Sequence, residues 1–213
     1  MHNVCSVNIK KMKSYHHGNL KKELIECACN ICERDGYSKL SIRSLAKESN
    51  VSQTAPYRHF KTKKDLFAAV ACEGFKKLNG QISSINDSSP QKYLIKCGKT
   101  YINFGLTKAN TYDLMFGTAV GNYADYPELN ESANKLFSIL LSSFKKLSND
   151  DDETVAFKCI TLWSMVHGLV GIIRKVNIVG DGNNNGPMPF AKQISKNLDF
   201  HLDKVIKGLI ETK

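Results

Sequence analysis

Apolar positions recur along nearly the whole chain with the spacing of amphipathic helices. A first helix is predicted to run from about Asn19, its cap, to Asp35, just before Gly36. Its inner face would carry Leu24, Ile25, Ala28, Ile31 and Cys32. No segment alternates apolar and polar residues as a half-buried strand does, and no internal repeat is visible. The predicted fold class is therefore all-α.

The segment 40–67 is the most informative part of this pattern. Ser41 can cap a short helix, and Asn50, which tolerates a left-handed backbone, suits the turn after it. Ser52 can cap a second short helix of about two turns. The run 62–65 (TKKD) then has the form of a capping box that opens a third helix. Two short helices joined by a tight turn, followed by a Lys-rich helix start, fit the major groove of DNA.

The rest of the chain also has helical periodicity. Helices are predicted at 63 to about 79, 91–108, 112–116, 128–147, 154–175 and 189–210, with a linker at 83–90 and a loop at 180–187. The last two helices are amphipathic and long, so they are predicted to form the seam of a dimer. The apolar stripe of the final helix comprises Ile194, Leu198, Leu202, Val205 and Leu209.

The positive charge of the chain is concentrated at one end. Residues 1–80 hold 15 Lys and Arg against 7 Asp and Glu, which is +8 of the formal net charge of +10. A solvated basic surface would explain this excess if it stood alone. Beside a helix-turn-helix pattern, the natural role of such a field is to neutralise DNA phosphates.

The segment from Tyr15 to about Phe75 resembles the DNA-binding domain of the TetR (tetracycline repressor) family. The matching stretches are YHHGNL, the Gly36-Tyr37 turn, LSIRSLAKESNVS and APYRHFKTKKDLF, with Asn50 standing where the family usually has Gly. Further along, the run 163–168 (WSMVHG) and the run 112–117 (YDLMFG) resemble a subgroup whose C-terminal domain carries a Trp-x3-His-Gly signature.

The resemblance implies a domain order and a set of partners. The expected parts are a basic arm (1–14), a helix-turn-helix domain (15–62), a connecting helix (63–82) and a ligand-binding and dimerisation domain (83–213). A homodimer would read a pseudo-palindromic double-stranded DNA operator and act as a repressor that a small-molecule effector releases. The alternative is a DNA-binding protein without such an effector, acting architecturally or through a protein partner.

Candidate DNA contacts follow from residue type and from the resemblance. Gln pairs bidentately with adenine and Arg with guanine, whereas a lysine at a helix start attracts phosphate. The predicted contact residues are Arg43, Gln53, Thr54 and Ala55 on the base-reading side, and Tyr57, His59 and Lys63 on the phosphate side. Simple exposure is the alternative for Arg43, and partial burial is the alternative for Tyr57.

The resemblance also places the helix of Trp163 and His167 beside an effector cavity. The candidate wall residues are Tyr101, Phe104, Met115, Phe116, Tyr123, Tyr126, Trp163 and His167. This mainly aromatic lining favours a small, mostly apolar effector. Ordinary core packing would explain the same residues equally well, and an effector-free protein would lack the cavity.

Other classes of protein find no support in the sequence. No P-loop, dinucleotide turn, zinc-protease motif or nucleophile elbow is visible, so neither an enzyme nor a cofactor is expected. Cys27 lies off the helix side shared by Cys29 and Cys32, so no metal site is predicted; structural thiols are favoured over an oxidant sensor. Basic residues interrupt the most apolar stretch, 162–180, and the first residues lack a signal-peptide pattern. We expect a cytoplasmic protein without a membrane span.

Overall fold

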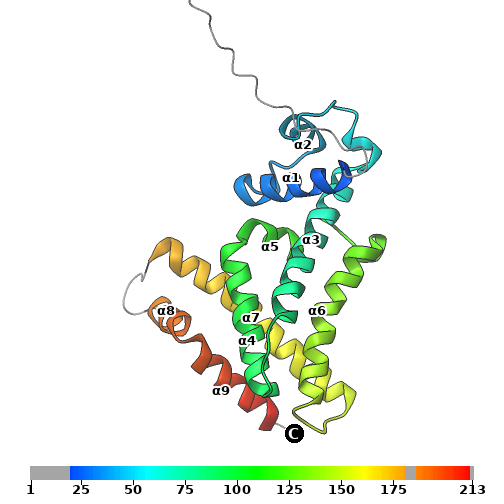
Figure 1. Cartoon of the computed structure of the whole chain (residues 1–213). Coiled ribbons are helices and arrows are strands. Elements are labelled where there is room, and N and C mark those ends of the chain that lie inside the picture. Colours follow the sequence, from blue (N-terminus) through cyan, green and yellow to red (C-terminus); the bar gives the residue numbers. More distant parts are fainter. Residues whose placement is uncertain (1–19, 181–185, 212–213) are drawn as a thin grey trace, which may run out of the picture.

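A computed structural model describes residues 20–180 and 186–211 of the 213-residue chain. Every regular element in this part is helical, which confirms the predicted all-α class (Figure 1). At one end lie α1 (Leu20–Asp35), α2 (Ile42–Glu48), the 3-10 turn η1 (Pro56–Arg58) and the start of α3 (Lys63–Ser83). The remaining elements are α4 (Pro90–Thr107), α5 (Ala109–Phe116), η2 (Tyr123–Asp125), α6 (Pro127–Lys145), α7 (Asp152–Val179), α8 (Met188–Lys196) and α9 (Leu198–Glu211). The expected basic arm, 1–14, lies outside the described residues.

Local signals place the ends of the first helices. The Ser41 hydroxyl accepts a hydrogen bond from the Ser44 amide, and the Ser44 hydroxyl accepts one from the Ser41 amide. Asn50 has φ 52°, the left-handed conformation predicted for the turn. Thr62 and Asp65 form the predicted capping box of α3. These three features fix the start of α2, the turn after it and the start of α3.

The second short helix of this motif differs from the prediction. A two-turn helix capped by Ser52 was expected, but the chain forms a turn at 53–55 and then the 3-10 turn η1. Pro56 has no N–H to bond the Ser52 carbonyl, so that carbonyl accepts the Ala55 amide instead, at 3.0 Å. The Pro56 carbonyl then accepts the amides of both His59 and Phe60, each at 2.9 Å, which tightens the segment into 3-10 geometry.

The prediction of one continuous final helix is wrong. The chain breaks at Asn197 (φ −135°, ψ 52°) into α8 and α9, and asparagine competes poorly for helical conformation because its side chain bonds nearby backbone. Leu202 is fully buried in its own subunit, where it packs on Gly98 of α4. The stripe of the last helix therefore serves mainly the core of its own chain.

Two glycines allow helices to cross closely in the lower part of the molecule as drawn in Figure 1, which comprises the second half of α3 and helices α4 to α9. A Cβ on Gly74 of α3 would lie 2.5 Å from Met115 Sδ of α5, and a Cβ on Gly105 of α4 would lie 2.6 Å from Val170 Cγ1 of α7. Any larger residue at either position would push the helices apart. The two crossings fix α5 and α7 against the central pair α3 and α4 (Figure 1).

Helix α7 is long and apolar enough to cross a membrane by length and composition alone. One of its sides is buried, from Val155 through Leu162 and Val166 to Ile173. A buried core helix meets the same criteria, and the contacts of α7 with α4 and α6 are those of such a helix.

Loss of the α3 cap should destabilise the protein. Thr62→Ala removes the acceptor of the Asp65 amide at the helix start, and such cap losses cost about 1 kcal/mol. We expect urea unfolding to show a decrease of that size. Thr118→Ala, at an exposed position outside any helix, is the matched control and should change little. Equal stability of both variants would show that the cap contributes nothing.

Candidate DNA-binding surface and ligand cavity

Most of the predicted DNA contacts are exposed on the helix-turn-helix. Arg43 on α2, Gln53 and Thr54 in the turn, and Tyr57 in η1 are all exposed, Tyr57 by 55%. Pro56 between them is buried and anchors the segment to the core. Ala55 and His59 are half-buried. The alternative that Tyr57 is partly core is therefore wrong.

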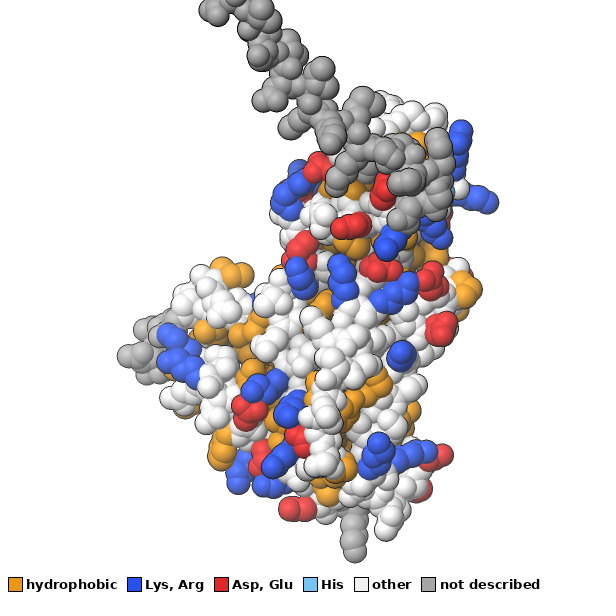
Figure 2. All heavy atoms as spheres, in the orientation of Figure 1, with side chains coloured by type: hydrophobic (Ala, Val, Ile, Leu, Met, Phe, Trp, Pro, Cys, Tyr) orange, Lys and Arg blue, Asp and Glu red, His pale blue; other side chains and the backbone are white. Residues whose placement is uncertain are grey.

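Lys63 lies at the first position of α3, directly after its cap. Its ammonium is 3.5 Å from the Ser38 carbonyl and 5.0 Å from the centre of the Phe67 ring. The backbone of Lys63 belongs to the helix start, whose free N–H groups favour an anion. Acidic and basic side chains intermingle on the face of this part shown in Figure 2.

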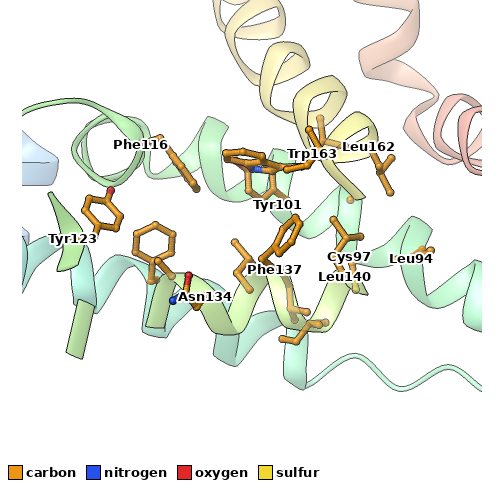
Figure 3. A pocket seen from close by; sticks show the side chains of 18 of the residues that line it. Leu94, Cys97, Tyr101, Phe116, Tyr123, Asn134, Phe137, Leu140, Leu162 and Trp163 are labelled. Atoms are coloured by element: carbon orange, nitrogen blue, oxygen red, sulfur yellow. The ribbon is translucent and has the colours of Figure 1, made fainter. Parts of the chain in front are cut away.

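A cavity of about 540 Å³ lies in the lower part of the molecule (Figure 3). Its lining comes from α3, α4, α5, α6 and α7 and from η2. The lining residues are Phe75, Ile82, Leu94, Cys97, Gly98, Tyr101, Phe116, Gly117, Tyr123, Ala133, Asn134, Leu136, Phe137, Ile139, Leu140, Ile160, Leu162, Trp163 and Val166. No side chain among them carries a charge at neutral pH, so the cavity is built for apolar contact.

The structure brings half of the predicted wall residues to this cavity. Tyr101, Phe116, Tyr123 and Trp163 line it. The other four do not line this cavity, because each one packs elsewhere. Phe104 is buried in the core, and Met115 packs at the crossing on Gly74. The Tyr126 hydroxyl points to Asp65 at 3.5 Å, and His167 Nδ1 lies 3.0 Å from the Tyr101 hydroxyl.

The whole wall contributed by α6 was missed by the sequence analysis. Phe137 and Leu140 point into the cavity from this helix, and Asn134 lies at its edge (Figure 3). The pattern did hold a signal: the run 136–141 (LFSILL) is apolar on more sides than one packing face requires. An amphipathic helix with such a wide apolar face needs a second neighbour or a cavity.

A hydrogen-bonded cluster lies behind the cavity wall. The Tyr112 hydroxyl is 2.6 Å and the Tyr101 hydroxyl 3.0 Å from His167 Nδ1, and the Trp163 indole N–H donates to the Tyr101 oxygen at 3.1 Å. Burial lowers the pKa of His167 below its ordinary value and raises the pKa of Tyr112 to about 12. The cluster is therefore neutral at physiological pH.

Helix α5 connects this cluster to the helix-turn-helix. On one side, Asp113 forms a two-pronged ion pair with Arg174 of α7, at 2.6 and 2.9 Å. On the other side, the Thr111 hydroxyl donates to the Glu33 carboxylate of α1 at 2.7 Å, and the Asn110 amide donates to the Glu33 carbonyl at 2.8 Å. Neighbouring residues of one short helix thus touch both the cavity side and α1.

Comparison with known protein families matches both ends of this architecture. Residues 24–70 match the profile described as bacterial regulatory proteins, tetR family, and residues 94–178 match that of the tetracyclin repressor-like C-terminal domain. Together the two profiles cover more than half of the chain. The chain belongs to the TetR family.

Known TetR-like proteins are similar to it at low identity. The uncharacterized HTH-type transcriptional regulator YobS of Bacillus subtilis (strain 168) is 23% identical over 97 residues, 45% of this chain and 51% of that protein. The alignment thus spans about half the length of this curated relative. Membership of a family of regulatory proteins also supports the prediction that the chain is not an enzyme.

Solved structures share the fold over almost the whole chain. A protein of unknown function from Rhodococcus sp. RHA1 has a TM-score of 0.71 at 21% identity, covering 91% of this chain and 98% of that one. A TetR variant from Acinetobacter baumannii AYE, solved with minocycline, gives 0.63 at 16% identity, covering 90% and 98%. BioQ, solved with its double-stranded DNA operator, gives 0.60 at 18% identity, also covering 90% and 98%.

The cysteines of this TetR-family chain fit the structural interpretation. Cys32 is fully buried in the core of the helix-turn-helix, and burial raises the pKa of Cys29 to about 11 and that of Cys32 to about 12. Thiols with such raised pKa values hold little thiolate, the form that reacts with oxidants.

The neutral state of His167 makes stability depend on pH. Because burial lowers its folded pKa below the ordinary value of 6.5, the unfolded chain binds a proton more readily. The free energy of unfolding should thus be intact above that value and fall as the pH drops through it. Between pH ~7.5 and ~5.5, His167→Gln should lose less stability than wild type in urea unfolding. His201→Gln, on α9, is the control; if His167→Gln loses as much as wild type, His167 does not cause the effect.

Proposed function

We propose that this protein is a DNA-binding transcriptional regulator that acts in the cytoplasm, as a repressor on a pseudo-palindromic operator. The observation that carries this is the exposure of Arg43, Gln53, Thr54 and Tyr57 on a capped helix-turn-helix. Two such surfaces in a dimer would enter successive major grooves about 34–36 Å apart. BioQ, a structure of the same fold, was solved with a DNA operator, which supports this use of the fold.

The second part of the proposal is release from DNA by a small, mostly apolar effector. The cavity of about 540 Å³ falls within the range of small-molecule sites, about 300–1,000 Å³, and its lining is almost wholly apolar. This favours an effector-binding regulator over the effector-free alternative. We also propose that the C-terminal part belongs to the subgroup with the Trp-x3-His-Gly signature, here residues 163–168.

A route from the cavity to the DNA-binding surface runs through α5. An effector that displaces Phe116 from the wall would move the helix whose Thr111 holds Glu33 of α1. The effector can shift the equilibrium only by the difference between its affinities for the two arrangements. In this scheme residues 15–62 bind DNA, 63–82 connect, and 83–213 hold the cavity and the dimer contacts.

A homodimer is the third part of the proposal. Helix α7 carries an exposed face, which we call the α7 face: Phe157, Ile160, Ser164, Gly168 and Ile172. Three of these are large and apolar, with Phe157 exposed by 67%, Ile160 by 47% and Ile172 by 43%. Hydrophobic side chains also reach the surface elsewhere in the lower part of the molecule (Figure 2). We assign the α7 face to a second copy of the chain.

Base reading can be separated from phosphate binding once the operator is known from sequencing genomic fragments bound by the purified protein. Gln53→Ala or Arg43→Ala should cost about 1–3 kcal/mol at one base position in each half-site and relax the preference there. Lys63→Ala should weaken operator and random DNA equally and reduce the salt slope by about 1. A uniform loss for Gln53→Ala, or an operator-specific loss for Lys63→Ala, would reverse the assignments.

A carboxylate in the α7 face should dissociate the dimer. Ile172→Glu would bury an unpaired charge at the interface, whereas its cost in the free subunit is small because the side chain is 43% exposed. Sedimentation should show a folded monomer that binds a half-site weakly. Ser142→Glu adds the same charge on the exposed side of α6 and should remain dimeric. A dimeric Ile172→Glu would move the interface elsewhere.

A further inference from the structure

The lining of the cavity holds few polar side chains, and most of them already have hydrogen-bond partners inside the protein. The Trp163 indole N–H donates to the Tyr101 oxygen at 3.1 Å, and the Tyr101 hydroxyl lies 3.0 Å from His167 Nδ1. The Tyr123 hydroxyl donates to the Met115 carbonyl. These groups are therefore occupied, and a ligand gains little from them beyond apolar contact.

Asn134 is the exception among the lining residues. It lies in the middle of α6 and is exposed at the edge of the cavity. Its amide nitrogen donates to the side-chain oxygen of Asn130, one turn earlier, at 3.4 Å. Its own side-chain oxygen accepts no hydrogen bond from residues 20–180 or 186–211. Asn134 thus keeps one hydrogen-bonding atom that a ligand can use.

The bond to Asn130 decides which end of this amide faces the cavity. Asn130 and Asn134 are four residues apart on α6, so their side chains are neighbours on one side of the helix. With the nitrogen turned toward Asn130, the oxygen is left on the cavity side, where Figure 3 shows it pointing. A carboxamide oxygen accepts hydrogen bonds and donates none. The cavity therefore offers a ligand one oriented acceptor.

The other end of the cavity has no comparable group. Leu94, Cys97, Leu140 and Leu162 line it, away from Asn134 in Figure 3. The only polar side-chain atom among these four is a thiol, which is a weak donor and a weak acceptor. A polar group of a ligand that reached this end would lose its water without gaining a partner, which costs free energy. The polar group of a ligand therefore belongs at the Asn134 end.

We propose that Asn134 selects the effector, an apolar molecule that carries one hydrogen-bond donor, a hydroxyl or an N–H group, at one end. The donor bonds the Asn134 side-chain oxygen, and the apolar body extends toward Leu94 and Leu162. The inference rests on the effector cavity proposed above, and adds the chemical class of the ligand and the residue that orients it.

Three naphthalenes of similar size test this hydrogen bond. The compound 2-naphthol carries a donor, 2-methoxynaphthalene carries only an acceptor, and 2-methylnaphthalene carries neither. Equilibrium dialysis gives their dissociation constants for wild type and for Asn134→Leu, which removes the amide with little change of volume. The affinity for 2-naphthol relative to 2-methylnaphthalene should fall about 3- to 10-fold in the variant, the contribution of one hydrogen bond. The relative affinity for 2-methoxynaphthalene should stay the same.

Two further variants identify the atom and control for the substitution. Asn134→Asp presents two acceptor oxygens and no donor, so it should keep or strengthen the preference for 2-naphthol. Asn103→Leu makes the same change as Asn134→Leu at an exposed position of α4 outside the cavity, and should leave the preference unchanged. Circular dichroism checks that each variant is folded.

The outcomes separate this inference from the function on which it rests. An unchanged relative affinity for 2-naphthol in Asn134→Leu would overturn the hydrogen bond and leave the apolar effector cavity intact. A preference that is lost in Asn134→Asp as well would show that the amide donates, which would overturn the assigned class of ligand. A wild type that binds none of the three compounds up to their solubility would overturn the effector cavity and the inference together.

Discussion

The continuity of α3 is the constraint on which the rest of the structure depends. Its 21 residues run without a break from the helix-turn-helix to the cavity, about 30 Å at the rise of an α-helix (Figure 1). Leu66 and Val70 near its start are buried in the helix-turn-helix core, whereas Phe75 and Ile82 further along line the cavity. One rigid rod therefore belongs to both parts, and its tilt is set by whatever fills the space beside its second half.

Helix α5 supplies a second connection of different character. Where α3 connects through its backbone, α5 connects through side chains that hold Glu33 on one side and Arg174 on the other. These polar contacts are specific in direction and can switch between discrete partners, which a packed apolar contact does less sharply. A rigid helix α3, combined with the directional polar contacts of α5, suits a protein with two arrangements of its DNA-binding surface.

Much of the fold could be read from the sequence because its signals are local. The caps at Ser41 and Thr62 and the left-handed Asn50 depend on residues at most three positions apart. The two errors, at Pro56 and Asn197, arose where a single residue redirects the backbone against the surrounding helical pattern. Hydrophobic periodicity is a property of many residues along a helix face, so it does not register a single residue that interrupts the helix.

The cavity was harder to predict because the type of a residue does not reveal whether its side chain packs on another helix or lines a cavity. Met115 and Tyr101 are both large and buried, yet Met115 fills a helix crossing at Gly74 and Tyr101 lines the cavity. The choice between them depends on the spacing of helices distant in sequence. The wall from α6 was missed for the same reason, since a wide apolar face indicates either a second neighbour or a cavity and does not distinguish between them.

The nearly uncharged lining has a consequence for selectivity. An apolar pocket discriminates a missing or extra methylene by only about 1–3 kcal/mol and rejects isosteres poorly, because it leaves few polar groups unpaired when the wrong molecule enters. A regulator built around this cavity would answer to a range of compounds of similar size and shape. The set of effectors it binds would be determined by cavity volume more than by polar contacts. Single substitutions at Ala133 or Leu140 would therefore change which compounds bind without altering the helix-turn-helix.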